Sequence, residues 1–588
     1  MSTRESIFIA GSLHRQQPAL VRRALRDGGT QEASGGFFSR GMLAAMALTT
    51  SHFPPDTSEP VLDTTVGGVL REAAAAVPDA VALVEGAPDP SARRRWTYAE
   101  LLATAERAAF ALRSRFEPGE QVAIWAPNIP EWVVVEFAAA LAGVTLVTVN
   151  PAYKPAEVRY VLTQSNSSGL LMVPEFRGNP MAATLASVRG ELPALREVVD
   201  LTGFEEFLAS GDAFAAAGGT LPDVTPDDPV QIQYTSGTTG FPKGARLAHR
   251  AITNNARLCM GRLDFGPDDA WVNPMPMFHT AGCVVATLGP VQARGRIVIA
   301  PWFDPALFFD LVEQEGGSAT LLVPTMLLAC LEHPAFGQRD LRNLRRVVSG
   351  GATVPADLVR RVEKEMGVTF DIVFGQTESG PVITQTFPAD APEDTAGTLG
   401  RPLPQTEVSI RSVGSDGVVP IGEVGEICTR GYLVMQGYFQ MPEATAAAIS
   451  ADGWLRTGDL GTMDERGYCR IAGRVKDMII RGGENIYPRE IEALLFGHPA
   501  VADVAVVGIP DDRWGETVAA FIRPSAGAAV EVAELFDFCR EHMAAFKTPR
   551  TWVVVDQFPT TASGKIQKYV LRERLTAGEY PSDAVVVR

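Results

Sequence analysis

Apolar and polar residues follow two different periods along most of the chain. From about residue 61, the segments VGGVLREAAAAV and TYAELLATAERAAFALRSRF place apolar residues on one face of a helix. Thr97 and Glu100 predict a capping box at the start of the second helix. Short apolar runs between the helices, among them AVALVEG, QVAIWA, VTLVTVN and RRVVSG, predict strands. Strands that alternate with helices predict parallel sheets covered by helices, which is an α/β fold.

The pattern changes after about residue 400. Segments such as EVSIRSVGSDG, GEVGEICTRG and GYCRIAG are short strands separated by turns, and they predict a small β-barrel-like subdomain. From Asp477 the predicted order is helix, strand, strand, helix and strand, which indicates a compact α+β unit. We therefore expect a large N-terminal domain of parallel-rich sheets over residues 61–474 and a smaller C-terminal domain over residues 475–588.

Residues 1–60 have weak periodicity and frequent Gly, Ser, Pro and Thr. The segment lacks the apolar core of a secretory signal. We interpret it as a poorly structured extension, or as the product of a start codon placed too early. A transit peptide is the alternative, which the acidic residues Glu5, Asp27 and Glu32 disfavour.

Composition narrows the class of protein. The chain has 588 residues, more than one core needs, and a net charge of −17. This charge argues against a nucleic-acid partner and against a polybasic membrane anchor. The six cysteines form no CxxC pair, which predicts a reduced, cytoplasmic compartment with neither a disulfide scaffold nor a zinc site. We find no run of about 18 apolar residues, so no membrane span is expected; WVVVEFAAALAGVTLVTV is read as a buried helix followed by a buried strand.

Lysine is rare in this chain. Lys and Arg total 52, yet only seven are Lys. A compact ammonium on a flexible stem is not equivalent to a planar guanidinium, so lysine is expected where arginine will not serve. Four of the seven lie in the motifs described next: Lys243, Lys476, Lys547 and Lys565.

The densest motif is TSGTTGFPKG, residues 235–244. Glycines let backbone N–H groups approach an oxyanion, hydroxyls donate hydrogen bonds, and Lys243 adds charge. The motif follows the strand-like DDPVQIQY and precedes the helical LAHRAITNNARL, so a strand–loop–helix arrangement is predicted. It is not a Walker loop, because Pro242 precedes the lysine and Gly244 follows it. The loop alone predicts a phosphate site without naming a reaction.

This motif resembles the signature of the adenylate-forming superfamily, which includes acyl- and aryl-CoA synthetases, peptide-synthetase adenylation domains and luciferases. The resemblance runs in order from about residue 65 to about residue 575. The chain is most similar to the fatty acyl-CoA synthetases, including the mitochondrial type with its NPAYKPAEVRYVL stretch. The resemblance implies ATP, Mg²⁺ and CoA as cofactor and cosubstrates, and a C-terminal domain that is mobile.

The resemblance also assigns site residues. His279 in PMPMFHTAG would face the acid's carboxylate; the alternative is a satisfied core histidine in an aromatic-rich turn. Glu378 in FGQTESG would be the catalytic Mg²⁺ ligand, with Thr235 as a second, because Mg²⁺ prefers hard oxygen donors. Asp459 in LRTGDL would accept hydrogen bonds from the ribose hydroxyls. The full predicted ATP site comprises Thr235, Ser236, Gly237, Thr238, Thr239, Gly240, Lys243, Gly351, Ala352, Phe374, Gly375, Thr377, Asp459, Arg474 and Lys565.

The second half of the predicted site lies after residue 474. Lys565 matches the lysine that bridges the substrate carboxylate and the α-phosphate, and Lys476 matches the hinge between two domain arrangements. Gly482 and Gly483 resemble the loop beside the pantetheine tunnel, and Lys547 resembles a contact for the CoA phosphates.

The implied reaction has two steps. A carboxylic acid attacks the ATP α-phosphate and pyrophosphate leaves; the thiol of CoA then displaces AMP. We expect a medium- or long-chain fatty acid as the substrate. The alternatives are an aryl or other acid, a separate acyl carrier protein as acceptor, and a non-catalytic nucleotide-binding regulator. The sequence leaves open whether the chain forms a homodimer.

Overall fold

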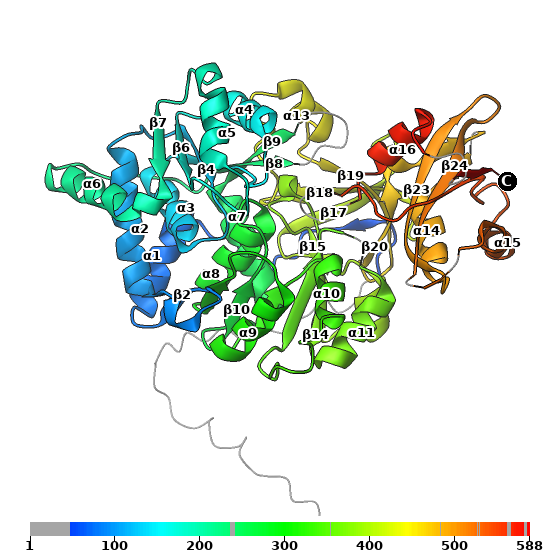
Figure 1. The fold of residues 1–588 in the computed structure, drawn as a ribbon, viewed down its shortest axis with the longest axis horizontal. Helices are drawn as coiled ribbons and strands as arrows, with labels where there is room; N and C mark the ends of the chain where they lie inside the picture. The colour runs from blue at the N-terminus through cyan, green and yellow to red at the C-terminus, as the bar shows by residue number, and fades with distance from the viewer. Residues whose placement is uncertain are drawn as a thin grey trace, which may run out of the picture. The chain divides into compact units, whose positions relative to one another are not determined.

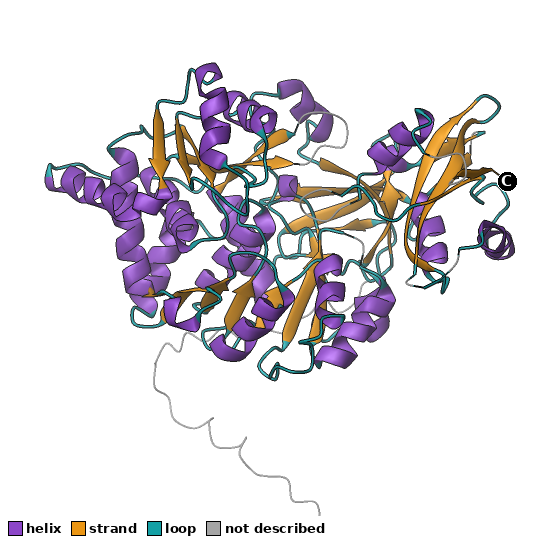
Figure 2. Cartoon of the chain, in the orientation of Figure 1, coloured by secondary structure: helices purple, strands orange, loops and turns teal. Residues whose placement is uncertain are grey.

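The computed structural model describes residues 47–235, 242–352, 354–482, 484–525, 527–528, 530–560, 566–580 and 585–587. Seven predicted site residues lie outside this description: Ser236, Gly237, Thr238, Thr239, Gly240, Gly483 and Lys565. Figure 1 follows the described elements along the chain by colour, and Figure 2 shows helices packed around the sheets of the α/β region.

The largest sheet of the described residues has nine strands. The strands from β14 to β2 run parallel, whereas β3, β15 and β16 are antiparallel at the two edges. Its order is β16 (Arg401–Pro402), β15 (Thr384–Gln385), β14 (Thr369–Phe374), β13 (Arg346–Gly350), β12 (Ala319–Leu321), β10 (Ala270–Asn273), β11 (Arg296–Ile299), β2 (Val81–Glu85) and β3 (Arg95–Thr97). Its helices and helical turns are η1 (Pro90–Ala92), α7 (His249–Arg262), the π-helix η4 (Ala281–Leu288), α8 (Gly289–Gln292), α9 (Pro305–Glu315), α10 (Pro324–Leu331), α11 (Ala356–Met366), η5 (Thr377–Ser379) and α12 (Pro392–Gly397).

A second sheet of six described strands is parallel except for its last strand. Its order is β7 (Glu197–Asp200), β6 (Gly169–Met172), β4 (Gln121–Trp125), β5 (Thr145–Thr148), β8 (Pro229–Thr235) and β9 (Lys243–Ala248). The helices of this part are α1 (Val66–Ala76), α2 (Tyr98–Arg113), α3 (Pro130–Ala142), α4 (Pro155–Gln164), α5 (Met181–Val188), η2 (Arg189–Glu191), η3 (Leu201–Gly203) and α6 (Phe204–Ala216). The parallel α/β architecture expected from the sequence is confirmed.

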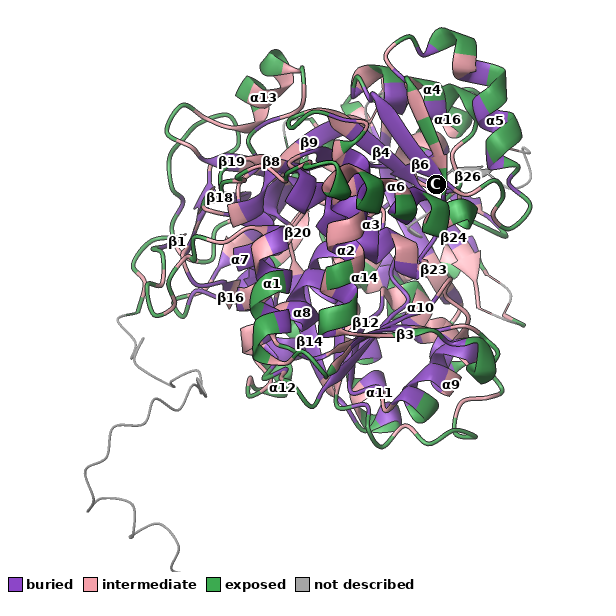
Figure 3. Cartoon of the chain, turned by 90° about the vertical axis from the view of Figure 1, so that its left-hand side faces the viewer, coloured by how far each residue is buried: buried purple, intermediate pink, exposed green. Residues whose placement is uncertain are grey.

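The core of this region follows from the sequence pattern. Helices α1, α2 and α3 contact one another and share one large apolar cluster. The capping box of α2 is confirmed: Thr97 and Glu100 each accept a hydrogen bond from the other's backbone N–H. Every residue of α3 except Glu131 is buried, as are all four residues of β5, so the predicted buried helix and strand are confirmed. The buried strands β4 and β6 are visible in Figure 3.

The region after residue 400 contributes a five-stranded antiparallel sheet, ordered β1 (His52–Phe53), β17 (Thr406–Arg411), β18 (Gly425–Gly431), β19 (Leu455–Met463) and β20 (Cys469–Arg474), with α13 (Pro442–Ala448) beside it in sequence. Pairings between the described residues do not close this sheet into a barrel. The structure also corrects the extension predicted over residues 1–60. His52 and Phe53 form β1 and pair with β17. Ser51 and Phe53 are buried, and Phe53 packs in the apolar core of this sheet.

The C-terminal part has its own apolar core, formed entirely by residues beyond 478. The predicted order of elements is confirmed by α14 (Pro488–Phe496), β23 (Val501–Asp511), β24 (Gly515–Pro524), α15 (Val532–His542) and β25 (Thr551–Val554). The remaining elements are η6 (Val475–Asp477), β21 (Ile479–Arg481), β22 (Glu484–Ile486), α16 (Lys568–Thr576) and β26 (Val585–Val587).

Two bulk properties bear on function. All six cysteines are free and buried. Among the described helices, none combines the length and the apolar character that crossing a bilayer requires.

Candidate active site

The segment predicted to be a phosphate loop begins and ends on two antiparallel strands. Thr235 ends β8 and pairs with Lys243, the first residue of β9, and the Thr235 hydroxyl donates to the Lys243 carbonyl at 3.4 Å. The helix expected directly after the loop, α7, begins only at His249. The strand predicted before the loop is β8 and the helix predicted for LAHRAITNNARL is α7, but β9 between the loop and the helix was not predicted. Ala245 and Leu247 are buried, so the segment after the loop first completes the sheet as an edge strand.

The residues 436–439 run along the other side of β9 and complete this edge. The Phe439 amide donates to the Gly244 carbonyl at 2.8 Å, and the Arg246 amide donates to the Gly437 carbonyl at 3.0 Å. This pairing sets Tyr438 beside Lys243, whose Nζ lies 4.9 Å from the centroid of the tyrosine ring. A lysine ammonium at this distance from an aromatic face is held by a cation–π interaction.

Tyr438 also contacts the predicted metal ligand. Its hydroxyl donates to Oε1 of Glu378 at 2.8 Å, and the Met435 amide donates to the Glu378 carbonyl at 2.9 Å. Glu378 is 8% exposed. Burial, together with the Glu378 charge, raises the pKa of the Tyr438 hydroxyl, so this group keeps its proton and remains a donor. Three side chains from separate segments, Lys243, Tyr438 and Glu378, thus form one contact cluster at the base of the phosphate loop.

The FGQTESG motif lies at a strand end, as predicted. Phe374 is the last residue of β14, and the 3₁₀ turn η5 follows. The Gln376 amide donates to the Ser379 hydroxyl at 3.1 Å, which fixes the turn that carries Glu378. A Cβ at Gly375 would lie 2.1 Å from the Pro381 carbonyl oxygen, so only glycine fits between this strand end and the returning chain.

Gly351 and Ala352 occupy the equivalent end of the neighbouring strand. β13 ends at Gly350, which is paired in parallel with Val373 of β14. Both residues that follow are exposed, and Gly351 has a φ of 71°. Carboxyl ends of adjacent parallel strands are where α/β sheets bind ligands. The structure therefore brings Gly351, Ala352 and Phe374 to one sheet edge.

His279 lies at the entry to the π-helix η4. Its ring Nδ1 accepts the Ala281 amide at 3.2 Å, and its carbonyl accepts the Cys283 amide at 3.1 Å. The preceding turn is fixed from the second sheet, because the Thr148 hydroxyl at the end of β5 donates to the Phe278 carbonyl at 2.9 Å.

The two predicted ribose contacts are joined directly. Asp459 of β19 pairs with Arg474 of β20, and Arg474 Nε donates to Asp459 Oδ1 at 2.8 Å. Lys476 follows at once in η6. Burial, then the charges of Arg474 and of Lys243, lowers the pKa of the Lys476 ammonium. The hinge candidate therefore lies within the electrostatic reach of the phosphate-loop lysine.

Two of the predicted CoA residues are described: Gly482 lies in the turn after β21, and Lys547 lies between α15 and β25. The Gly482 amide donates to the Trp514 carbonyl at 2.8 Å, and a Cβ at Gly482 would lie 2.7 Å from the indole ring. The guanidinium groups of Arg481 and Arg513 lie 5.2 and 4.8 Å from the centroid of that ring. In the described part of the chain, neither Gly482 nor Lys547 shares a hydrogen bond or ion pair with Lys243 or Glu378; Lys547 instead pairs with Glu490 at 2.7 Å.

Sequence reasoning missed two residues of these clusters. Tyr438 has no motif signal of its own, because its partners lie far away in the chain. Trp514 does have a sequence signal, because it is a large aromatic residue in the polar turn DDRWGE. In the structure it is 38% exposed.

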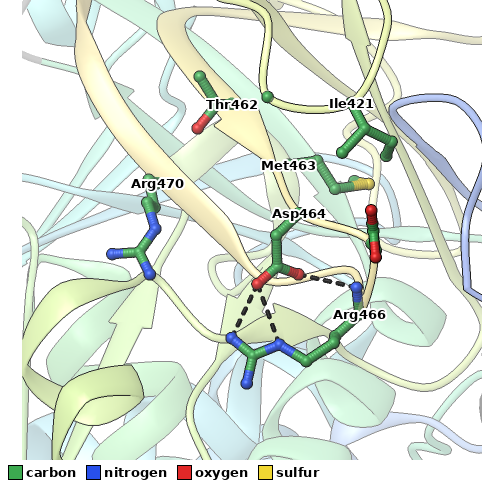
Figure 4. Close-up of a pocket in the computed structure, with 8 residues that line it drawn as sticks. Ile421, Thr462, Met463, Asp464, Arg466 and Arg470 are labelled. Carbon is green, nitrogen blue, oxygen red and sulfur yellow. Dashed lines mark hydrogen bonds and ion pairs between the residues drawn. The ribbon is translucent and has the colours of Figure 1, made fainter.

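A separate surface hollow of about 390 Å³ lies along the hairpin between β19 and β20 (Figure 4). Arg466 there donates to Asp464 at 2.8 Å and to both oxygens of Asp394 at 2.7 Å. None of the candidate site residues lines this hollow.

A parallel α/β scaffold followed by a smaller α+β unit is the architecture expected of an adenylate-forming enzyme. Residues 70–439 match the family model described as AMP-binding enzyme, and residues 490–565 match the AMP-binding enzyme C-terminal domain. The chain belongs to this family, the adenylate-forming enzymes that include the acyl-CoA synthetases. It activates a carboxylic acid with ATP by way of an adenylate.

Three similar proteins cover almost the whole of the described fold. YngI of Bacillus subtilis, provisionally named an acyl-CoA synthetase, is 41% identical over 539 residues, which cover 87% of this chain and 97% of YngI. The mitochondrial medium-chain acyl-CoA ligase ACSF2 of Rattus norvegicus is 36% identical and covers 89% of this chain and 90% of its own. The crystal structure of ATP-bound MatB from Rhodopseudomonas palustris has a TM-score of 0.79 and 30% identity, and covers 88% of this chain and 100% of MatB.

Proposed function

We propose that the protein is an ATP-dependent acyl-CoA synthetase that converts a medium- or long-chain fatty acid to acyl-AMP, with release of pyrophosphate, and then transfers the acyl group to the thiol of CoA. The observation that carries this proposal is the contact cluster of Lys243, Tyr438 and Glu378 at the base of the phosphate loop. A cation and a carboxylate beside a glycine-rich loop suit a triphosphate and its divalent cation.

The first step needs positioning and charge stabilisation more than covalent catalysis. The acid's carboxylate attacks the α-phosphate, and pyrophosphate leaves. Lys243 would hold the β- and γ-phosphates, Lys565 would bridge the α-phosphate and the acid, and His279 would face the acid's carboxylate. Because Lys243 is held over Tyr438 by a weak contact, it can exchange the ring for phosphate oxygens at small cost.

Glu378 and Thr235 are the proposed Mg²⁺ ligands. The donor set fits the ion, because a carboxylate with 8% exposure and a hydroxyl at the strand end are hard oxygen donors. Bound there, Mg²⁺ would neutralise charge on the phosphates. Tyr438 would orient the Glu378 carboxylate by its hydrogen bond to Oε1. This bond does not involve Oε2, whose lone pairs could bind the ion.

The nucleoside would lie across the sheet edges. Phe374 would stack on the adenine, with Gly375, Gly351 and Ala352 as the neighbouring wall, and Thr377 would donate to a phosphate. Asp459 would accept the ribose hydroxyls, with Arg474 as its partner. Support comes from the 2.8 Å contact between Asp459 and Arg474, which orients the carboxylate.

The second step would use the other face of the C-terminal domain. We propose a domain boundary at residues 474 and 475, with Lys476 as the hinge, so that Lys565 leaves and Gly482, Gly483 and Lys547 approach the adenylate. Trp514 joins this set, because an aromatic ring flanked by two guanidinium groups suits a nucleotide with phosphates.

The fatty-acid assignment rests on relatives, since ACSF2 is named a medium-chain ligase. The residues Met277 and Val284, near His279 in sequence, are fully buried in the core and do not by themselves define an acyl pocket. A cytoplasmic location is part of the proposal and is supported by the free, buried cysteines.

Pyrophosphate release with hexanoate, laurate and benzoate, each with and without CoA, tests the proposal. We expect release with the fatty acids and an acyl-CoA product when CoA is added. Pyrophosphate release with benzoate and with neither fatty acid would show that the substrate is an aryl acid. Acyl-AMP without a CoA thioester would point to a carrier protein as acceptor. No release with any acid, and no difference from Glu378→Gln, would refute the enzymatic role.

A further inference from the structure

Four polar side chains lie in contact inside the largest apolar core. Glu136 belongs to α3, Gln231 and Gln233 belong to β8, and Cys283 belongs to the π-helix η4. Their exposed fractions are 1%, 0%, 2% and 0%, respectively. Their sequence neighbours Val135, Phe137 and Val284 are members of the surrounding core cluster.

The contacts form a continuous path across three elements. Gln231 Nε2 donates to Glu136 Oε1 at 2.8 Å. Gln233 Nε2 donates to Gln231 Oε1 at 2.8 Å and to the Cys283 sulfur at 3.0 Å. The Cys283 thiol in turn lies 3.7 Å from Gln231 Oε1, which closes a triangle.

The path is made of neutral groups. Burial raises the pKa of Glu136 well above its usual value, and burial does the same to the pKa of the Cys283 thiol. Both groups therefore keep their protons. An isolated carboxylate at this depth would be costly, whereas a protonated one accepts the Gln231 amide without leaving a charge in the core.

Stability alone does not account for these residues. Apolar side chains of the same size pack such a core at least as well, and buried polar groups are favourable only when their hydrogen bonds are made. Hydrogen bonds differ from apolar contacts because they have direction, so they fix how elements lie against one another. The network therefore constrains the positions of α3, β8 and η4.

Two of these elements lead directly into the candidate active site. Gln233 stands two residues before Thr235, where the phosphate loop begins, and Cys283 stands four residues after His279. η4 is a π-helix, a rare form that often marks functional positions. Its entry is closely packed, since a Cβ at Gly282 would lie 2.3 Å from the Pro276 carbonyl oxygen. A shift of η4 relative to β8 would therefore move His279 relative to the phosphate loop.

We propose that Glu136, Gln231, Gln233 and Cys283 are positioning residues that hold η4 against β8 and so set the place of the acid's carboxylate relative to the phosphates of ATP. This inference rests on the proposed function. It concerns only the first step, because none of the four residues belongs to the C-terminal domain.

The variant Gln233→Leu tests the inference, because leucine keeps the volume and removes both donated hydrogen bonds. In pyrophosphate exchange we expect an adenylation rate about 10- to 100-fold lower and a higher KM for the acid, since a small misplacement of reactants costs rate on this scale. The KM for ATP should stay within about twofold, because none of the four residues is a predicted ATP contact. Cys283→Ala removes the contacts of the thiol with Gln233 and Gln231 and provides the same test if Gln233→Leu does not fold.

Two controls separate positioning from stability. Glu136→Gln keeps an acceptor of the same shape and should retain activity, whereas Glu136→Leu should lose it. Ile232→Val, on the opposite face of β8, should lower the melting temperature without changing the KM for the acid. The effect of the double variant Gln233→Leu/Cys283→Ala should be smaller than the sum of the two single effects, because both variants remove the Gln233–Cys283 contact.

Wild-type kinetics in Gln233→Leu and Cys283→Ala would overturn the inference, as would equal increases in the KM values for acid and ATP. An inactive wild-type protein would instead contradict the proposed function. Failure of the positioning inference can therefore be distinguished from failure of the proposed function.

Discussion

Removing one hydroxyl, in Tyr438→Phe, tests how the metal ligand is held. The change deletes the 2.8 Å hydrogen bond to Glu378 and keeps the ring beneath Lys243. A hydrogen bond to a charged group contributes about 1.5–3 kcal/mol, and Glu378 is too buried for water to replace it fully. If that energy orients the carboxylate for Mg²⁺, kcat/KM for ATP should fall by about 10- to 100-fold.

The assay is pyrophosphate exchange over a range of Mg²⁺ concentrations, together with calorimetric titration of Mg²⁺ and ATP. Tyr438→Phe should need more Mg²⁺ for half-maximal rate and should bind Mg²⁺-ATP more weakly. The matched control is Tyr234→Phe in β8, which removes a hydroxyl that donates to Gln164 of α4 at 2.5 Å and, within the residues that the structure describes, shares no hydrogen bond with Glu378. An unchanged Mg²⁺ requirement and unchanged ATP binding in Tyr438→Phe would refute this account of Glu378.

Four further changes test other parts of the site and one buried carboxyl of β14. Lys565→Ala should abolish pyrophosphate exchange yet largely spare thioester formation from supplied acyl-adenylate; equal loss of both half-reactions would contradict the two-state domain motion. Lys476→Pro should slow the thiol step more than adenylation, and stopped-flow traces with unchanged rates for both would remove it from the hinge. Trp514→Ala should raise the KM for CoA about tenfold without changing pyrophosphate exchange, because a stacked ring contributes about 1–2 kcal/mol; a changed ATP KM would place Trp514 elsewhere. Burial raises the pKa of Asp371 to about 7 from 3.8, so the folded state keeps a proton that the unfolded state loses, and stability should fall between about pH 4 and pH 7. Asp371→Asn should remove this fall, worth up to about 4 kcal/mol, and equal melting temperature differences from wild type at pH 5 and pH 8 would argue against it.

The sequence by itself determined the elements and the chemistry of the motifs. Local signals were sufficient for the Thr97–Glu100 capping box, for the buried helix α3 and for the order of elements in the C-terminal part. Each depends on residues a few positions apart, so periodicity and capping chemistry reveal them. The same holds for the placement of FGQTESG at the end of β14.

Only the tertiary structure decided which side chains meet. Tyr438 reaches Glu378 across 60 positions of sequence, and Gln231 reaches Glu136 across 95. These contacts follow from the pairing of residues 436–439 with β9 and from the packing of α3 and η4 on β8, which no local pattern encodes. The edge strand β9 was not predicted for the same reason: KGARLA becomes a strand because β8 and the returning chain supply its hydrogen-bond partners, and those partners are known only once the sheet is assembled.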